Sequence, residues 1–330
     1  MKTPATSTND NFVTAVTIMS SCMLVVAFCA TATAGYVVEY AGNLQLNEGR
    51  HGAPRPVSVS ADPVTGELCV SDAAGSALHV LHRDGASLFT TDRLAGLSNP
   101  ADGAFIADGE FVFIDTGADH VRTIQRLDLR GEPVTFTAQS PVENWIPDHL
   151  TVLADGHLLS LDNSLGLLVK HHADTGAVIW QRALWNDTNV ELVVGRPSEA
   201  PDGRLYVPVS QEHRILVLTS DGMPEDSFGV IGTTPGKFSF PVDVAFGPEG
   251  TVLVLDRMRH KVLIFDESHQ FLTEYGRMGS SPGAFYHPVS IAYASGRAYV
   301  AQSFEGRVQV FDVFSTDAVN PERQALRALN

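Results

Sequence analysis

The chain has 330 residues, of which 44% are hydrophobic and 18% are charged, a balance typical of a folded protein rather than a disordered one. Its formal net charge of −16 repels both the phosphate backbone of nucleic acid and an anionic membrane surface. We therefore expect no nucleic-acid partner, whereas a protein, a peptide, a glycan or a small ligand stays open as a partner.

The N-terminal segment is typical of an export signal. Lys2 supplies a positive start, an apolar run extends from Phe12 to Cys29, and Ala32-Thr33-Ala34 before Gly35 forms a small-x-small cleavage site. We expect residues 1–34 to be a signal peptide that sends the mature chain to the periplasm or outside the cell. The alternative is an uncleaved membrane anchor, because the apolar run is long for a signal. In that case the membrane is contacted only through this segment.

Regularly spaced glycines mark the turns of a repeat. They close short sequences such as LADG, APDG and GPEG, and successive glycines lie between 43 and 47 residues apart. Glycine suits a tight hairpin turn because it adopts positive φ without strain. A proline opens the strand before the turn in four of the six copies, and further short apolar strands follow the turn. The six turn glycines are Gly66, Gly109, Gly156, Gly203, Gly250 and Gly296.

A four-stranded unit of this length cannot bury both of its faces alone, so neighbouring units must stack, and closing them into a ring protects their edges. We predict an all-β protein, a six-bladed β-propeller of four-stranded antiparallel blades over residues 35–313, with a C-terminal tail over residues 314–330. The last copy lacks a clear fourth strand. The N-terminal GYVVEYAG is similar to the fourth strand FLTEYGRMG at residues 271–279. We therefore expect residues 36–42 to complete the last blade.

The clearest copies of the repeat are FPVDVAFGPEGTVLVLDRMRHKVLIFD, residues 240–266, and HPVSIAYASGRAYVAQSFEGRVQVFD, residues 287–312. They resemble NHL repeats, whose pattern is a proline-opened strand, a glycine turn, a VxD-type strand end and an R-[IV]-x-x-F strand. The resemblance covers residues 36–312 and implies the propeller fold. It says little about function, because one propeller scaffold hosts many activities.

Several positions have expected structural roles. An aspartate ends the second strand in four copies, where its carboxylate can accept hydrogen bonds from the backbone of the following loop. Cys69 lies inside a predicted strand, and we expect it to be a buried, inert thiol. His171 and His172 end a strand and begin a turn, where we expect both to be exposed.

In propellers of this kind the innermost strand begins at one mouth of the central channel. The second residue after each opening position should line that mouth, which gives Ser58, Asp102, His149, Arg196, Asp243 and Ser290. One interpretation is a polar pocket in which His149 titrates near neutral pH, Asp102 orients it and Arg196 clamps a carboxylate. The other is a set of mutually satisfied groups around a wet channel, with Arg196 paired to Asp243.

The loops between the second and third strands should open on the same face. They contribute the remaining candidates for a ligand-binding face, together with Trp145, which we expect to project over the rim before the third blade. These loop residues are His120, His213, Arg214, Arg257, Arg259, His260 and Glu305.

Metal binding has one specific precedent among propellers with a similar repeat. In the peptidylglycine amidating lyase, zinc-binding histidines directly follow the blade prolines. None of the residues at those positions is a histidine here: they are Val57, Ala101, Asp148, Gly195, Val242 and Val289. The sequence does not support a three-histidine zinc site. A Ca²⁺ ion in the central channel stays open, because backbone carbonyl ligands leave no trace in a sequence.

Two functions are consistent with these patterns. The favoured one is an exported binding or scaffolding module that presents one face of the ring to a partner. The alternative is a metal-dependent lyase or hydrolase with its chemistry at the channel mouth, near His149, Arg196, Asp102 and Asp243.

Overall fold

A computed structural model describes residues 35–46, 53–62, 64–91, 96–106, 109–185 and 192–316. The chain divides into two units, residues 1–33 and 34–330, and only the second contains described residues. The predicted signal peptide and most of the predicted C-terminal tail therefore lie outside the described residues. Within them, no helix has the length and apolar character needed to cross a membrane.

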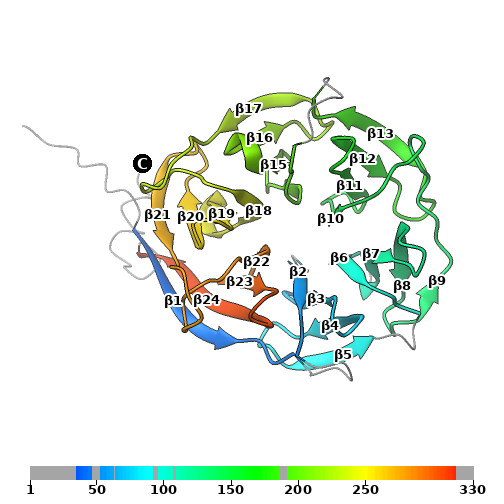
Figure 1. The fold of residues 1–330 in the computed structure, drawn as a ribbon, viewed down its shortest axis with the longest axis horizontal. Helices are drawn as coiled ribbons and strands as arrows, with labels where there is room; N and C mark the ends of the chain where they lie inside the picture. Colours follow the sequence, from blue (N-terminus) through cyan, green and yellow to red (C-terminus); the bar gives the residue numbers. More distant parts are fainter. Residues whose placement is uncertain are drawn as a thin grey trace, which may run out of the picture. The chain divides into compact units, whose positions relative to one another are not determined.

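Six four-stranded antiparallel sheets are arranged in a ring, with the first strand of each sheet innermost (Figure 1). The predicted fold class is confirmed. Helix is limited, in the described part of the chain, to short pieces such as the 3-10 turn Ser210–Glu212.

Five of the six blades consist of four consecutive strands. Blade 1 holds β2 (Pro56–Ala61), β3 (Leu68–Asp72), β4 (Ala77–Leu81) and β5 (Ser87–Thr91); blade 2 holds β6 (Pro100–Phe105), β7 (Phe111–Thr116), β8 (Arg122–Leu127) and β9 (Pro133–Val134); blade 3 holds β10 (His149–Val152), β11 (Leu158–Asp162), β12 (Leu167–His171) and β13 (Val178–Ala183). Blade 4 holds β14 (Ser198–Glu199), β15 (Leu205–Val209), β16 (Arg214–Leu218) and β17 (Pro224–Phe228); blade 5 holds β18 (Pro241–Phe246), β19 (Val252–Asp256), β20 (Lys261–Phe265) and β21 (Phe271–Tyr275).

Blade 6 draws its strands from both sides of the sequence. It contains β22 (Ser290–Ala294), β23 (Arg297–Gln302) and β24 (Arg307–Ser315), and its outer strand is β1 (Tyr36–Asn43). β1 pairs antiparallel with β24, from Tyr36 opposite Ser315 to Asn43 opposite Gln309. Figure 1 shows the blue β1 lying along the red β24 at the edge of the ring.

The ring has two different faces. The turn face carries the hairpins between first and second strands, where Gly156 and Gly203 have φ of +81° and +86°. A side chain with a Cβ adopts that conformation at a cost, which explains the regular spacing of the glycines. The loop face carries the starts of the first strands and the loops between second and third strands.

Aspartates at the ends of the second strands hold together the loop-face segments of their own blade. The Asp256 carboxylate accepts hydrogen bonds from the backbone N–H groups of Met258 and Arg259 in the following loop. It also accepts from the N–H groups of Ser239 and Phe240, which lead into the same blade. The first pair was expected from the sequence. The second pair was not, and it means that one carboxylate fixes two separate segments of the loop face.

Hydrophobic clusters fill the spaces between neighbouring blades. The cluster between blades 4 and 5, for example, joins Tyr206, Ile215 and Val254 to Phe238, a fully buried side chain from the connecting segment. Cys69 lies in the cluster between blades 1 and 2, and burial raises the pKa of its thiol to about 12. This is the inert thiol that the sequence predicts, and it leaves chemistry to the channel and the two faces.

Candidate functional site

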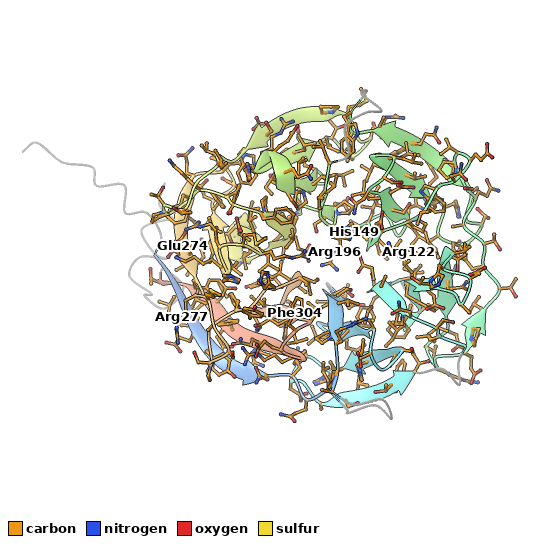
Figure 2. All side chains as sticks on the ribbon, viewed as in Figure 1. Arg122, His149, Arg196, Glu274, Arg277 and Phe304 are labelled. Atoms are coloured by element: carbon orange, nitrogen blue, oxygen red, sulfur yellow. The ribbon has the colours of Figure 1, made fainter. Side chains whose placement is uncertain are left out.

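Arg196 crosses the centre of the channel and contacts four other blades. Its guanidinium lies 3.2 Å from the Asp243 carboxylate and 3.6 Å from that of Asp102. It also donates to the backbone carbonyl of Val59 at 3.1 Å and to that of Ile291 at 3.0 Å. Its side chain is only 11% exposed. Figure 2 shows Arg196 near the middle of the ring, beside His149. Arg196 therefore closes the channel at this level and links blades on opposite sides of the ring.

The two carboxylates that meet Arg196 are themselves held in place. Asp102 accepts a hydrogen bond from the N–H of Leu150, and Asp243 accepts from the Ser290 hydroxyl and the N–H of Ile291. Burial opposes ionisation of Asp102, but His149 and Arg196 together hold its pKa below the usual value. Burial dominates at Asp243 and raises its pKa, although Arg196 opposes the rise.

His149 lies at the loop-face end of the channel, where β10 begins. Its Nδ1 is 3.8 Å from the Asp102 carboxylate, and its side chain is 28% exposed. The structure thus brings together His149, Asp102, Arg196 and Asp243, the four candidates selected from the sequence. The contacts of Arg196 fit the second interpretation, in which the channel groups satisfy one another and Arg196 pairs with Asp243.

The centre of the channel does not fit the Ca²⁺ ion that the sequence left open. A calcium site needs free oxygen ligands, but at this level the Asp243 carboxylate and two backbone carbonyls already accept hydrogen bonds from the Arg196 guanidinium, which also lies 3.6 Å from the Asp102 carboxylate. The positive charge of Arg196 would also repel a cation there. Across the described ranges, no three His, Cys, Asp or Glu side chains are grouped so that they could hold a metal ion.

Most of the candidate ligand-binding residues of the loop face are engaged within the protein. Arg259 pairs with Glu274 at 2.9 Å, Arg214 pairs with Glu212, and the His213 ring lies 2.7 Å from the carbonyl of Ser239. The His260 side chain is buried, and its Nδ1 accepts from the N–H of His287. These contacts position the loops. His120 is exposed, and Arg257 retains an incomplete set of partners.

Two expectations about blade 3 are wrong. Trp145 packs inward against the core between blades 2 and 3 instead of projecting over the rim, because its indole meets the His171 ring at 5.3 Å. His171 is fully buried rather than exposed, and its ring lies 3.0 Å from the Ser160 hydroxyl. The strand end allows this because β12 continues through His171, so that its side chain alternates toward the interior.

A cavity of about 870 Å³ occupies the channel on the other side of Arg196. It begins at Leu150, one residue past His149, and extends to Gly156 and Gly203 in the hairpin turns, so it opens on the turn face. Asp62, Glu199 and Asp202 lie at its rim, and burial raises the pKa of Glu199. Its walls are mainly apolar and include Phe105, Ile106, Leu150, Val244, Phe246 and Ile291. We call this cavity the funnel.

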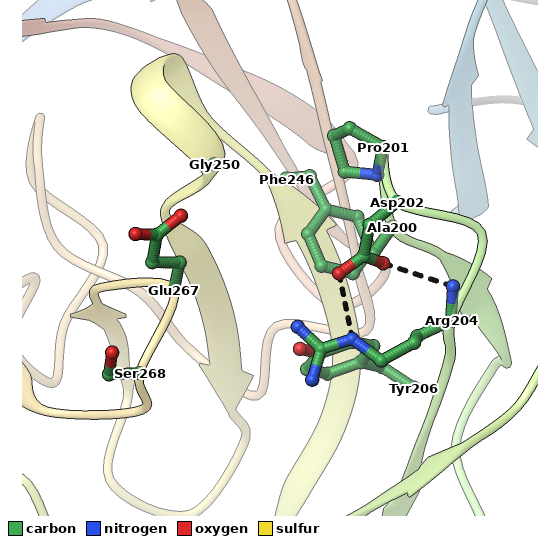
Figure 3. Close-up of a pocket in the computed structure, with 9 residues that line it drawn as sticks. All are labelled: Ala200, Pro201, Asp202, Arg204, Tyr206, Phe246, Gly250, Glu267 and Ser268. Carbon is green, nitrogen blue, oxygen red and sulfur yellow. Dashed lines mark hydrogen bonds and ion pairs between the residues drawn. The ribbon is translucent and has the colours of Figure 1, made fainter.

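A smaller pocket of about 330 Å³ adjoins the funnel between blades 4 and 5. Figure 3 shows the ion pair inside it between Asp202 and Arg204, whose closest atoms are 2.7 Å apart. The Arg204 guanidinium also lies over the Tyr206 ring, at 5.7 Å from its centroid. Phe246 and Asp202 line both the pocket and the funnel, so the two cavities are continuous.

Sequence reasoning did not find the funnel. Its walls are ordinary strand residues that alternate toward the channel, and apolar residues at such positions are equally typical of a packed core. The one available signal was the small side chains near the ends of the inner strands, such as Ser60, Ala104 and Ala245, which leave the channel open at that end.

No family model matches the chain, and no curated protein matches it either, so the NHL identity of the repeat stays a prediction. Solved structures do match. A protein of unknown function from Bacteroides thetaiotaomicron has a TM-score of 0.65 at 13% identity, over 84% of this chain and 76% of its own. An auxiliary nutrient binding protein from the same organism has a TM-score of 0.60 at 13% identity, over 85% and 77% of the two chains.

An enzyme has the same architecture. Catalytically inactive virginiamycin B lyase from Staphylococcus aureus, solved with quinupristin, has a TM-score of 0.58 at 14% identity, over 84% of this chain and 99% of its own. At this level of identity a likeness shows the fold alone. The chain is therefore a six-bladed β-propeller.

Proposed function

We propose that the protein is an exported, NHL-type binding module whose propeller takes a small ligand with an apolar body into the funnel. The observation that carries the proposal is the funnel itself, a cavity of about 870 Å³ closed at its inner end by Arg196. Ligand sites in proteins are typically concave, mostly apolar and of roughly 300–1,000 Å³.

The electrostatics of the inner end support a binding role. Arg196 is ion-paired with Asp102 and Asp243, so the inner end of the funnel has no unpaired charge that would select a charged ligand. The apolar walls then supply the affinity, at roughly 25 cal/mol for each Å² of apolar surface removed from water. The nutrient-binding relative in fold is consistent with a binding module, although the likeness says nothing about this ligand.

The alternative, a metal-dependent lyase or hydrolase, has one observation in its favour. His149 is partly exposed and lies near Asp102, an arrangement that general acid–base chemistry can use. Against it, Arg196 and Asp243 hold each other and are not free to contact a substrate. The binding module is therefore the better supported function.

The test uses N-phenyl-1-naphthylamine, an uncharged apolar fluorophore. We expect the protein to bind one molecule with a saturable rise in fluorescence, because the walls exclude water. Ser60 lines the funnel, and its buried hydroxyl contacts no hydrogen-bond partner in the described structure. Ser60→Trp should occupy part of the cavity and lower the affinity at least ten-fold. Ser87→Trp, at an exposed position of the outer strand β5, is the matched control.

Folding of the variants is checked by circular dichroism. Should Ser60→Trp not fold, Ala154→Trp places the same side chain at the exposed mouth of the funnel, where packing is not disturbed. Unchanged binding in a folded funnel variant, or an equal loss in Ser87→Trp, would contradict the proposal.

A further inference from the structure

Arg257 is a partly buried arginine of the loop face that lacks a carboxylate partner. It directly follows β19, and its Nε donates to the carbonyl of Pro288 in blade 6 at 3.4 Å. The guanidinium carbon lies 6.0 Å from the centroid of the Phe240 ring. No carboxylate among the described residues pairs with it, and burial alone lowers its pKa. The outer two nitrogens are therefore available for a ligand.

Two neighbouring arginines, Arg259 of blade 5 and Arg307 of blade 6, do find hydrogen-bond acceptors or a carboxylate within the protein. Arg259 donates to the carbonyl of Thr233 and pairs with Glu274. Arg307 donates to the carbonyls of Ser280 and Ala284. A partly buried cation without a carboxylate partner costs stability, and the carbonyl of Pro288 and the Phe240 ring offset only part of that cost.

An aromatic surface occupies the neighbouring loops of blades 5 and 6. The rings of Tyr286 and His287 are 4.8 Å apart, and both meet Phe304, at 6.1 and 5.8 Å respectively. The His260 ring is parallel to that of Tyr286, with the centroids 6.1 Å apart. Phe304 is 76% exposed, and Figure 2 places it near the centre of the ring. We call these four residues the aromatic platform. One of its members, His287, directly precedes Pro288, whose carbonyl accepts the hydrogen bond from Arg257.

We propose that Arg257 and the aromatic platform form a binding subsite for a carboxylate carried on an aromatic group. The planar guanidinium matches a carboxylate, with which it forms paired, charge-assisted hydrogen bonds. Aromatic groups bind rings at their faces and edges. Glu305 adjoins Phe304 in sequence and pairs with no cation within the described ranges. Its negative charge directs the ligand carboxylate away from Phe304 and toward Arg257.

This subsite lies on the loop face, whereas the funnel opens on the turn face. It does not depend on the proposed function, and each can fail without the other. The same chemistry occurs in two sources, a free aromatic acid and the C-terminal aromatic residue of a peptide, and the experiment distinguishes them.

The experiment measures binding to the purified protein by isothermal titration calorimetry. Phenylacetate is the probe for a free acid, phenylacetamide removes its charge, and cyclohexylacetate removes its aromatic ring. Acetyl-Gly-Phe with a free carboxylate is the probe for a peptide terminus. We expect one site for phenylacetate or for the peptide, with at least ten-fold weaker binding of phenylacetamide and weaker binding of cyclohexylacetate. Whichever of the two probes binds more tightly identifies the source.

Arg257→Gln should weaken binding of the acid at least ten-fold, and Phe304→Ala should weaken it by a smaller factor. Arg277→Gln is the matched control, because Arg277 is an exposed arginine of blade 5 at the outer edge of the ring (Figure 2) and changes the net charge equally. N-phenyl-1-naphthylamine binding in the funnel should be unchanged in all three variants.

Three outcomes would overturn the proposal. Phenylacetamide or inorganic phosphate could bind as tightly as phenylacetate, which would remove the carboxylate or the aromatic group from the recognition. Arg277→Gln could weaken binding as much as Arg257→Gln, which would reduce the effect to net charge. Arg257→Gln could lower the melting temperature as much as Arg259→Gln, which would make Arg257 a structural residue like its neighbour.

Discussion

The centre of the channel and the gap between blades 5 and 6 each hold a buried or partly buried arginine, and their surroundings differ. Arg196 meets two carboxylates and two carbonyls from four blades. Arg257 meets one carbonyl, and no carboxylate of the described chain pairs with it. The first arginine has everything that a buried cation requires, and the second does not.

This difference in partners assigns a structural role to Arg196 and a binding role to Arg257. A cation that the fold has already matched is costly to remove and has little left to offer a ligand. A cation that the fold leaves unmatched costs little to remove, and its free donors suit an anionic ligand. The turn face and the loop face then have different chemistry, since the funnel offers apolar walls and the loop face offers a charge.

The largest expected effect comes from removing the matched arginine. Arg196→Met leaves Asp102 and Asp243 buried without their partner, so we expect a loss of about 3–5 kcal/mol in the free energy of unfolding. Urea denaturation followed by circular dichroism measures it. Arg204→Met is the control, because the Arg204–Asp202 pair is exposed and should contribute less than about 1 kcal/mol. A similar small loss in both variants would remove the contrast between matched and unmatched arginines.

The dependence of stability on pH tests a buried basic group of another kind, His171. Burial lowers the pKa of His171 to about 4, so the folded protein holds this ring neutral. The unfolded chain protonates it below pH 6.5, and stability contributed above that pH is lost progressively as the pH falls toward 4. We expect His171 to account for about 3 kcal/mol of this loss. Unfolding of wild type and His171→Gln from pH 7.5 to 4.5 measures it, and parallel curves for the two proteins would contradict the assignment.

The smallest effect is expected at the channel mouth. His149 is partly solvated, and Asp102 keeps its hydrogen bond from Leu150 and its contact with Arg196 when the imidazole is removed. His149→Ala should therefore change the free energy of unfolding by less than about 1 kcal/mol. Thermal unfolding tests this. A loss comparable to that of Arg196→Met would mean that His149 contributes as much to the free energy of unfolding as Arg196 does.

The sequence predicts the fold well because the propeller repeats a local rule. Each turn glycine marks a hairpin, and the counting that it allows also placed Asp102, His149, Arg196 and Asp243 on one ring of the channel. The same counting could not find the funnel, whose walls have no chemical signature.

The loop face shows the limit more directly. Arg257 and Arg259 are two residues apart in one loop, and nothing in that loop distinguishes them. Their difference comes from Glu274 in the outer strand β21, which reaches Arg259, and from the absence of a similar carboxylate near Arg257 in the described structure. Pairing across separate strands and blades is a property of the folded ring, so a single sequence cannot disclose which charge remains free.

The pairing of β1 with β24 also constrains how the ring assembles in time. The Thr316 hydroxyl donates to the carbonyl of Gly35, 281 residues away in the sequence. Blade 6 cannot be completed until both segments are present, so the other blades can form while the edge of β1 is still unpaired. Contacts of such long sequence separation slow folding. An unpaired strand edge is also a template for association with another chain. A ring in which β1 and β24 have not yet paired is thus the form of this propeller that is most open to misassembly.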